Sequence, residues 1–421
     1  MAGLCLAAVL LGACSTGNGA APSPSAEAGG DWAMYRGDLA RDGHPAGATL
    51  GAAGAKRLKA VWQVEMSGGV NGTPAIAGGV VVAASEGGVV AAYRAGSGTR
   101  IWQVDRLGPI SGSPTIAGGR VIVATLSGHI YALDLGTGNR MWDAVAPGVK
   151  PALWSSPTVY GQVVLLGVGS QYGDDPLEAG RVIALDVGTG KQVWAVCVLE
   201  GCRPGDGIWS SPAIDGAGRG FIGVGNPDDG VLAFDVASGR RLWMTSFHAD
   251  DGRDVDIGAT PIVLMAGGRE SIAVGSNAGV FKLLDATTGA VIWSRDLVSG
   301  SAVHGLLASP GYDGTNFYVP SAGTPVGIFA LGVAGGRTRW TYDSGLPVYS
   351  APAIGNGVLV FGIGDVFGDP NAGGIVALSS RDGSVLWIAD FHSAAFSAPA
   401  MSGDMVIIGN SRGDVIAYRP G

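Results

Sequence analysis

The segment Ala132-Leu-Asp-Leu-Gly-Thr-Gly-Asn-Arg-Met-Trp142 contains a pattern that returns along most of the chain. An Ala is followed two positions later by an Asp, then after four positions by a Gly and after four more by a Trp. The Gly and Trp of this frame recur at Gly98/Trp102, Gly190/Trp194, Gly239/Trp243, Gly289/Trp293, Gly336/Trp340 and Gly383/Trp387. Copies in one register define a repeat unit, and this unit decides the fold.

Each copy of the frame predicts a strand, a tight turn and a second strand. The apolar run before Asp134 ends at a carboxylate that can accept hydrogen bonds from nearby amides, and Gly138 supplies the positive φ of a turn. The large flat face of Trp142 suits packing between neighbouring sheets, and the small Ala132 permits the close approach that this packing requires. We therefore interpret the tryptophans of the frame as packing residues.

The spacing of these tryptophans predicts four short strands in each unit. Successive Trp residues from Trp62 to Trp387 lie 40 to 52 residues apart, a period that suits a four-stranded sheet. Within one unit we expect strands at 112–116, 120–124, 129–133 and 139–142. After Trp387 only three strands return, at 397–401, 405–408 and 414–418.

The missing fourth strand is expected at the other end of the chain, where Leu58-Lys-Ala-Val-Trp62-Gln-Val has the pattern of a closing strand. Its pairing with the last unit predicts an all-β fold, an eight-bladed β-propeller of four-stranded antiparallel blades, in which residues 57–65 complete the last blade. Ring closure removes most exposed sheet edges. An open solenoid is the alternative, but it needs no complementary termini.

Composition supports one large repeat domain and excludes several classes of partner. The chain has 421 residues, 74 of them Gly, and only 14% are charged, which fits short buried strands joined by tight turns. The formal net charge of −8 and the absence of a Lys/Arg run argue against nucleic acid and against an anionic membrane surface. We expect a monomer.

The N-terminus predicts a lipid anchor. Leu11-Gly-Ala-Cys14 resembles the lipobox cleaved before a lipidated Cys, so we interpret residues 1–14 as a lipoprotein signal segment and Cys14 as the lipidation site. Residues 15–30, rich in Ser, Pro, Ala and Gly, read as a flexible tether. The propeller is expected over residues 31–421, opening with a cap at 31–43 whose charges form local salt bridges.

This anchor places the mature chain outside the cytoplasm, in the periplasm or on the outer cell surface, attached to the membrane by lipid alone. In an oxidising compartment Cys197 and Cys202, which share one loop between strands, are expected to form a small-loop disulfide.

The frame, together with the Ser-x-Pro that opens many units, resembles the pyrroloquinoline quinone (PQQ) repeat of the quinoprotein alcohol dehydrogenases, over roughly residues 31 to 421. The segment from Gly207 to Asn226 resembles the cofactor blade of that family. The resemblance implies that Trp209 is the floor on which the quinone stacks and that Asn226 binds its calcium, which prefers oxygen ligands. The segment Asp254-Val-Asp256 resembles the polyvinyl alcohol dehydrogenase branch, where Asp254 or Asp256 would be the catalytic base.

Two positions depart from that pattern. Where the family has a calcium-binding Glu, this chain offers the neutral Gln171, so a charged ligand beside Asn226 and Asp256 is lost. Where a Lys or Arg faces the quinone oxygens, this chain offers Asn277, which cannot stabilise the anion of the reduced cofactor in the same way. The phrase Trp154-Ser-Ser-Pro also repeats Trp209-Ser-Ser-Pro one unit earlier, so Trp209 has an alternative interpretation as a strand-packing residue.

Two functions from different classes therefore remain. The first is a lipid-anchored binding or scaffold propeller, a degenerate quinoprotein that presents its loops to an envelope protein or polymer. The second is a PQQ- and calcium-dependent alcohol dehydrogenase acting on a small alcohol. A repeat fold does not decide between them.

Overall fold

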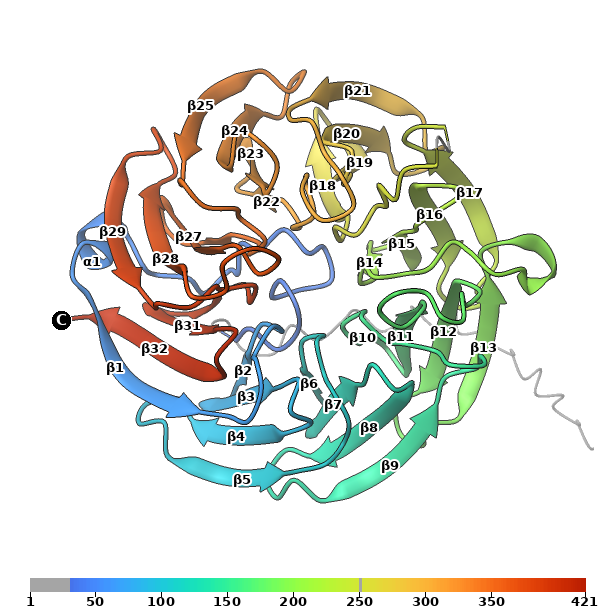
Figure 1. The fold of residues 1–421 in the computed structure, drawn as a ribbon, viewed down its shortest axis with the longest axis horizontal. Helices are drawn as coiled ribbons and strands as arrows, with labels where there is room; N and C mark the ends of the chain where they lie inside the picture. The colour runs from blue at the N-terminus through green and yellow to red at the C-terminus, as the bar shows by residue number, and fades with distance from the viewer. Residues whose placement is uncertain (1–30, 250–251) are drawn as a thin grey trace, which may run out of the picture.

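A computed structural model describes residues 31–249 and 252–421, which form a closed ring of eight four-stranded antiparallel sheets (Figure 1). The all-β, eight-bladed propeller predicted from the repeats is thus confirmed. Blade 1 contains β2 (Ala75–Ala77), β3 (Val80–Ala84), β4 (Val90–Arg94) and β5 (Arg100–Val104). Blade 2 contains β6 (Thr115–Ala117), β7 (Arg120–Ala124), β8 (His129–Asp134) and β9 (Arg140–Val145). Blade 3 contains β10 (Thr158–Tyr160), β11 (Val163–Val168), β12 (Arg181–Asp186) and β13 (Gln192–Cys197).

The remaining blades follow in chain order around the ring. Blade 4 contains β14 (Ala213–Ile214), β15 (Arg219–Gly223), β16 (Gly230–Asp235) and β17 (Arg241–Ser246). Blade 5 contains β18 (Ile262–Ala266), β19 (Arg269–Gly275), β20 (Val280–Asp285) and β21 (Val291–Asp296). Blade 6 contains β22 (Gly311–Tyr312), β23 (Asn316–Ser321), β24 (Gly327–Gly332) and β25 (Thr338–Asp343). Blade 7 contains β26 (Ala353–Ile354), β27 (Val358–Gly364), β28 (Gly373–Ser379) and β29 (Val385–Asp390). Blade 8 contains β30 (Ala400–Ser402), β31 (Met405–Gly409), β32 (Asp414–Pro420) and β1 (Leu58–Glu65).

The repeat frame builds the outer hairpin of each blade. Asp134 Oδ1 accepts hydrogen bonds from the backbone N–H of Gly136 at 3.1 Å and of Thr137 at 2.9 Å, which closes the turn. A further hydrogen bond from the Thr137 hydroxyl also stabilises the charged carboxylate, and these bonds lower the pKa of Asp134. The turn chemistry expected of the Asp is therefore confirmed.

The Gly of the frame, and not the Ala, is the residue that accommodates the neighbouring blade. Ala132 pairs with Trp142 of its own blade across β8 and β9. The ring of Trp102, from the preceding blade, lies against Gly138, and its Nε1 donates a hydrogen bond to the carbonyl oxygen of Leu135 at 2.7 Å. A bare Cα at Gly138 is required both by this contact and by its φ of +73°.

Blade 8 combines the two ends of the propeller. β1 pairs antiparallel with β32 in a register that runs from Leu58 opposite Pro420 to Glu65 opposite Asp414. Because the third and fourth strands of this blade come from opposite ends, no hairpin turn joins them. At the junction with blade 7, Trp387 packs edge-on against Tyr418, with ring centroids 5.0 Å apart. The short helix α1 (Ala52–Ala55) contacts β29 and β32 at the same junction.

The innermost strands begin later than expected. The strand predicted over 112–116 starts at Thr115, after Pro114, because proline has no N–H to donate to the sheet. Ser113, the residue before the proline, forms hydrogen bonds with both neighbouring blades. Its hydroxyl accepts the N–H of Thr73 in blade 1 at 2.8 Å, and its own N–H donates to the Ser156 hydroxyl in blade 3 at 2.9 Å.

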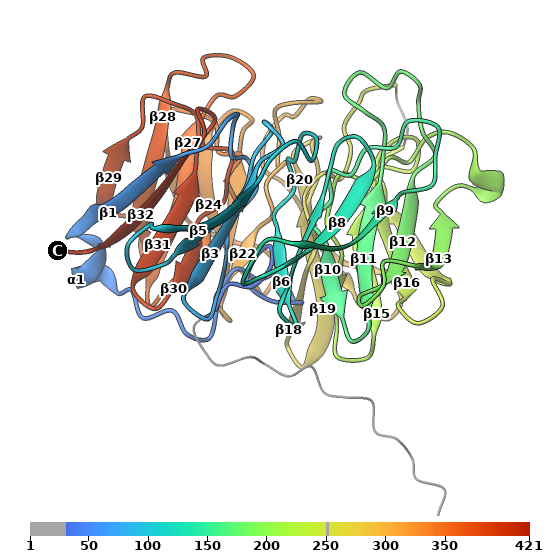
Figure 2. The ribbon, with the colours of Figure 1, turned by 90° about the horizontal axis from the view of Figure 1, so that it is seen from below.

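The N-terminal segment from Trp32 to Leu50 crosses one end of the ring (Figure 2). It exchanges backbone hydrogen bonds with the innermost strands of blades on both sides, for example from Ile116 N–H to Ala33 and from Tyr312 N–H to Asp42. This arrangement closes one end of the central channel, as expected of a cap.

Two buried arginines of this segment join blades. Arg36 donates to the carbonyl oxygens of Pro352 at 2.6 Å and Pro310 at 2.8 Å, in blades 7 and 6. Arg41 donates to the carbonyl oxygen of Pro212 at 3.1 Å. The two arginines of the cap thus donate mainly to backbone carbonyls, which differs from the local salt bridges expected from the sequence.

Cys197 and Cys202 form the expected disulfide, beside a 3₁₀ helix at Glu200–Cys202. The signal segment, Cys14 and the tether at 15–30 lie outside the described residues. Within residues 31–249 and 252–421, no helix has the length and apolar character needed to cross a bilayer.

Candidate functional site

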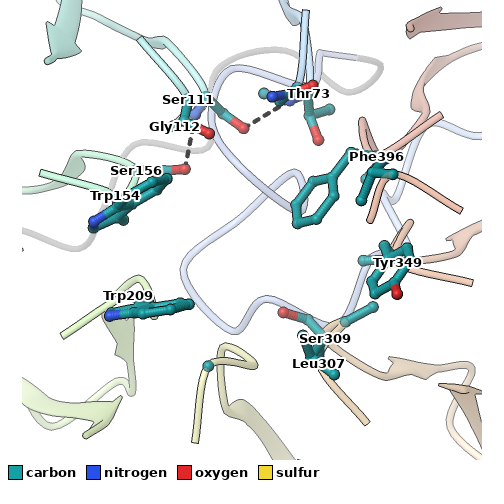
Figure 3. A pocket seen from close by; sticks show the side chains of 18 of the residues that line it. Thr73, Ser111, Gly112, Trp154, Ser156, Trp209, Leu307, Ser309, Tyr349 and Phe396 are labelled. Atoms are coloured by element: carbon teal, nitrogen blue, oxygen red, sulfur yellow. Dashed lines mark hydrogen bonds between the residues drawn. The ribbon is translucent and has the colours of Figure 1, made fainter. Parts of the chain in front are cut away.

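A cavity of about 430 Å³ lies at the centre of the ring and is lined by residues of the blades and by one residue of the N-terminal cap. Loops that enter the innermost strands form its walls, so that every blade contributes to it (Figure 3). Tyr35 of the cap also lines it, and the Tyr35 hydroxyl lies 3.0 Å from that of Ser309. The cap thus provides part of the floor.

A belt of hydroxyl groups lines this cavity over six consecutive blades. Five of the six hydroxyls accept the N–H of the equivalent residue in the blade before them, at 2.8 to 2.9 Å, whereas the hydroxyl of Thr73, the first member, has no partner among the described residues. The members of the belt are Thr73, Ser113, Ser156, Ser211, Thr260 and Ser309. In blades 7 and 8 the equivalent positions are Ala351 and Ala398, so this side of the cavity is apolar.

Aromatic rings form two walls that face each other across the cavity (Figure 3). On one side, Trp154 and Trp209 are stacked with centroids 5.7 Å apart, and Trp154 Nε1 donates to the carbonyl of Ser170 at 2.9 Å. On the other side, Tyr349 stacks on Phe396 with centroids 5.7 Å apart and an interplanar angle of 9°. The Tyr349 hydroxyl donates to the carbonyl of Val303 at 2.9 Å, which fixes this wall.

Glu86 is the only charged side chain among the described residues that line the cavity. Partial shielding from water raises its pKa, and a hydrogen bond with Asn71 opposes that shift. Without Lys, Arg or His in this lining, the cavity offers aromatic faces, hydroxyls and a single acid.

Two of the predicted site residues line this cavity. Trp209, 37% exposed, presents its ring to the open space, which confirms neither the cofactor-floor nor the packing interpretation but places the ring where a ligand can reach it. Asn277 is buried; its Nδ2 donates to the carbonyl of Ala302 at 3.0 Å, and its Oδ1 has no partner among the described residues.

Asn226, Asp254 and Asp256 gather in a second group beside the cavity but are absent from its lining. Asn226 Nδ2 donates to Asp229 Oδ2 at 3.1 Å. Asp256 is 7% exposed, and its Oδ1 has no partner among the described residues. Burial, assisted by the negative charges of Asp254 and Asp229, raises the pKa of Asp256 to about 7.

A calcium ion would find an incomplete ligand set here. Gln171 follows β11 and accepts a hydrogen bond from Asp174 N–H through its backbone carbonyl, while its neutral side chain does not line the cavity. Among residues 31–249 and 252–421, no three acidic, His or Cys side chains converge in a way that would hold a metal ion. Asp256 and Asn226 together supply only part of the oxygen cage that calcium requires.

The quinone fits the cavity even less well. Pyrroloquinoline quinone carries three carboxylates, and burying each of them requires a cationic or hydrogen-bonding partner. The described lining contains no cation, and Asn277 stands where the resembled family has one. The residues present therefore do not match the charge of this cofactor.

The second aromatic wall was not predicted from the sequence. Tyr349 and Phe396 each stand immediately before a Ser-Ala-Pro segment, which replaces Ser-Ser-Pro ahead of the innermost strands of blades 7 and 8. An aromatic residue one position before that Ser, as in Trp154 and Trp209, was the signal that could have identified them.

Comparison with known proteins agrees with this architecture. Polyvinylalcohol dehydrogenase from Sphingopyxis sp. (strain 113P3) is 30% identical over 218 residues, which cover 39% of this chain. The match spans only 33% of that relative. Among solved structures, quinohemoprotein alcohol dehydrogenase from Comamonas testosteroni superimposes with a TM-score of 0.81 at 17% identity, covering 93% of this chain and 81% of that one.

The solved structure of BamB from Moraxella catarrhalis superimposes with a TM-score of 0.67 at 18% identity, covering 86% of this chain and 99% of that one. At such identities these structures show the shared fold alone. A family model described as outer membrane protein assembly factor BamB matches residues 47–263 and 276–421, most of the propeller. This chain therefore belongs to the PQQ-repeat propeller family that this model represents, and it is related to the quinoprotein dehydrogenases as well as to BamB.

Proposed function

We propose that this chain is a lipid-anchored, extracytoplasmic binding propeller whose central cavity holds an uncharged, hydroxyl-bearing ligand of the cell envelope. The observation that carries the proposal is the chemistry of the cavity, which combines two aromatic walls and a hydroxyl belt with one acid and no cation in its described lining. Flat aromatic faces pack against apolar ligand surfaces, and hydroxyls bind polar edges without requiring charge.

Location in the envelope is supported by family membership, since the matching model is described as an outer membrane assembly factor. The lipobox-like Leu11-Gly-Ala-Cys14 supports attachment through lipid. The disulfide between Cys197 and Cys202 is consistent with an oxidising compartment.

Ligand titration tests this function. Purified protein would be titrated with cellobiose and with digalacturonate, a neutral and an anionic disaccharide, while the fluorescence of Trp154 and Trp209 is followed. We expect saturable binding of the neutral sugar alone, loss of binding in Trp209→Ala, and retention in Trp209→Phe because the flat face remains. Failure of the protein to bind any neutral hydroxylated ligand would refute the proposal.

Alcohol oxidation with bound quinone and calcium is the alternative, and Asp256 is the observation that favours it. A buried carboxyl with an unpartnered oxygen and a pKa of about 7 has the properties of a general base. The partial similarity to polyvinylalcohol dehydrogenase points in the same direction.

Adding pyrroloquinoline quinone and calcium to the protein distinguishes the two functions. We expect no tight quenching of fluorescence and no reduction of a redox dye with primary or secondary alcohols. Stoichiometric quinone binding with alcohol-dependent dye reduction, abolished in Asp256→Asn, would establish the enzyme instead. If binding is absent, Gln171→Glu with Asn277→Lys tests whether these two departures are its cause.

A further inference from the structure

Two loops on opposite sides of the ring are longer than their counterparts. The loop between the second and third strands spans residues 169–180 in blade 3 and 365–372 in blade 7. In the other six blades this connection has at most six residues, as at 224–229 in blade 4. Figure 1 places these two blades across the ring from each other, and Figure 2 shows both loops rising at the end away from the cap.

Each long loop carries an exposed aromatic residue at the edge of the cavity. Tyr172, in the blade 3 loop, is 76% exposed, and Phe367, in the blade 7 loop, is 44% exposed. Both line the cavity. Large exposed aromatics at the mouth of an open cavity are typical of a binding surface.

Both loops are held in place by hydrogen bonds. Glu178, buried in the blade 3 loop, accepts the N–H of Val149 at 2.6 Å and donates its own N–H to the Ser170 hydroxyl at 2.9 Å. In the blade 7 loop, Asp365 Oδ1 accepts the N–H of Phe367 at 3.1 Å and of Gly368 at 2.9 Å. Each aromatic ring is therefore presented by a structured loop.

Tyr172 and Phe367, at the rim, extend the two walls described above, so that a line of aromatic residues runs from blade 3 to blade 7 and is interrupted by the open centre of the cavity. Phe367 packs edge-on against Tyr349, with centroids 5.5 Å apart, and Tyr349 stacks on Phe396. At the other end, Tyr172 lies two residues after Ser170, whose carbonyl accepts the indole N–H of Trp154. We call this line the aromatic track; its members are Tyr172, Trp154, Trp209, Phe396, Tyr349 and Phe367.

We infer that the ligand is a chain, an uncharged glycan that lies across the mouth of the cavity along the aromatic track from blade 3 to blade 7. A pyranose ring offers an apolar face for aromatic rings and hydroxyls at its edge for the belt, and successive sugars would occupy successive parts of the track. The acidic residues of the two loops, Asp174, Asp175, Asp365 and Asp369, disfavour an anionic chain. This inference rests on the proposed function and adds to it the length and direction of the ligand.

Affinity as a function of chain length tests it. Cellobiose and cellohexaose would be titrated calorimetrically into the wild type, Tyr172→Ala and Phe367→Ala. We expect the hexamer to bind at least about tenfold more tightly than the dimer, because it reaches both rims. Each rim variant should weaken hexamer binding by about three- to tenfold and dimer binding by less, so that the preference for the hexamer shrinks.

Ile388→Ala is the matched control, since Ile388 is an apolar residue of blade 7 with 52% exposure on the outer strand β29, away from the track. Melting temperatures confirm that the variants fold. If dimer and hexamer bind with equal affinity, and Tyr172→Ala and Phe367→Ala change neither affinity, the inference that the ligand is a chain is wrong. The proposed function would remain intact. Absence of binding at any length would contradict both the chain and the proposed function. Preference for oligogalacturonate would show that the glycan is anionic, and preference for an unstructured peptide would show that the ligand is not a glycan; either result would overturn the inference.

Discussion

A Cβ atom on Gly138 would lie 2.7 Å from Cε3 of Trp102, so the indole ring of blade 1 packs directly against the turn of blade 2. Gly190 and Trp142 make the same contact in the next pair of blades, where a Cβ atom on Gly190 would lie 2.5 Å from Cε3 of Trp142. The indole N–H of each donates to a carbonyl oxygen of the blade that receives it. The ring is therefore held together at its periphery by one repeated contact.

Gly138→Ala should be strongly destabilising. The added methyl group meets both the ring of Trp102 and a positive φ, and we expect the free energy of unfolding to fall by roughly 2–4 kcal/mol. Gly119→Ala is the control, because Gly119 has the same φ of +73° with nothing within 4 Å of its would-be Cβ. Urea denaturation measures both, and equal midpoints would show that the Trp102 contact contributes nothing.

Arg36→Lys should destabilise the ring even though charge is conserved. The guanidinium donates to carbonyls of two blades in a fixed geometry that an ammonium group cannot reproduce. We expect a loss of roughly 2–5 kcal/mol, because buried acceptors are left unpaired. Arg337→Lys, at an exposed arginine of blade 6, should leave thermal melting unchanged, and similar melting of the two variants would contradict the role of Arg36.

Stability should fall as pH rises from about 4 to about 7. Burial raises the pKa of Asp206 and of Asp256 to about 7 from an ordinary value of 3.8, so each folded-state carboxyl retains a proton that the unfolded chain has lost. The stabilisation of the protonated groups is complete below the unfolded pKa and is lost as pH passes through the folded pKa.

Asp206→Asn should therefore reduce the difference between urea midpoints at pH 5 and pH 8. The half-buried Asp404, whose carboxylate lies 3.8 Å from the guanidinium of Arg419, supplies the control Asp404→Asn, which should keep the wild-type difference. A wild-type protein that is more stable at pH 8 than at pH 5 would show that other groups dominate.

Cys14→Ser should release the protein from the membrane fraction. The lipid attached to Cys14 is proposed as the sole anchor, and the described residues contain no helix long and apolar enough to cross a bilayer. Fractionation with calorimetry measures both location and folding, and Cys5→Ser, in the same N-terminal stretch, is the control. An exported, folded Cys14→Ser protein that remains with membranes would instead indicate a protein partner.

The frame around Ala132 and Trp142 was sufficient to predict the number of blades, the closing strand and the turn chemistry, because these depend on local residues repeated in register. It did not reveal that Gly138 seats the ring of Trp102, since contacts between blades depend on the rotation from one sheet to the next. The binding of Arg36 to backbone carbonyls was equally hidden, because a carbonyl acceptor has no signature in the sequence.

The site was less predictable than the fold. Trp209 and Asn277 were identified as candidates and do line the cavity, whereas Asn226 and Asp256 lie beside it and Gln171 is absent from its lining. Tyr172 and Phe367 belong to loops that lengthen individual repeats, so no shared pattern marked them. Only the length of one repeat indicated the loop of Tyr172, because the interval of 52 residues from Trp142 to Trp194 is the longest between frame tryptophans.

The pairing of β1 with β32 also constrains the order in which the propeller can fold. On a growing polypeptide, the strand from Leu58 to Glu65 is made before the seven other blades, and its partner from Asp414 to Pro420 is made after them. The hydrogen-bonding edge of β1 therefore has no partner while those blades are synthesised, and contacts of such long sequence separation form slowly. During that time the edge of β1 is open to pairing with other strands, until β32 is made and covers it.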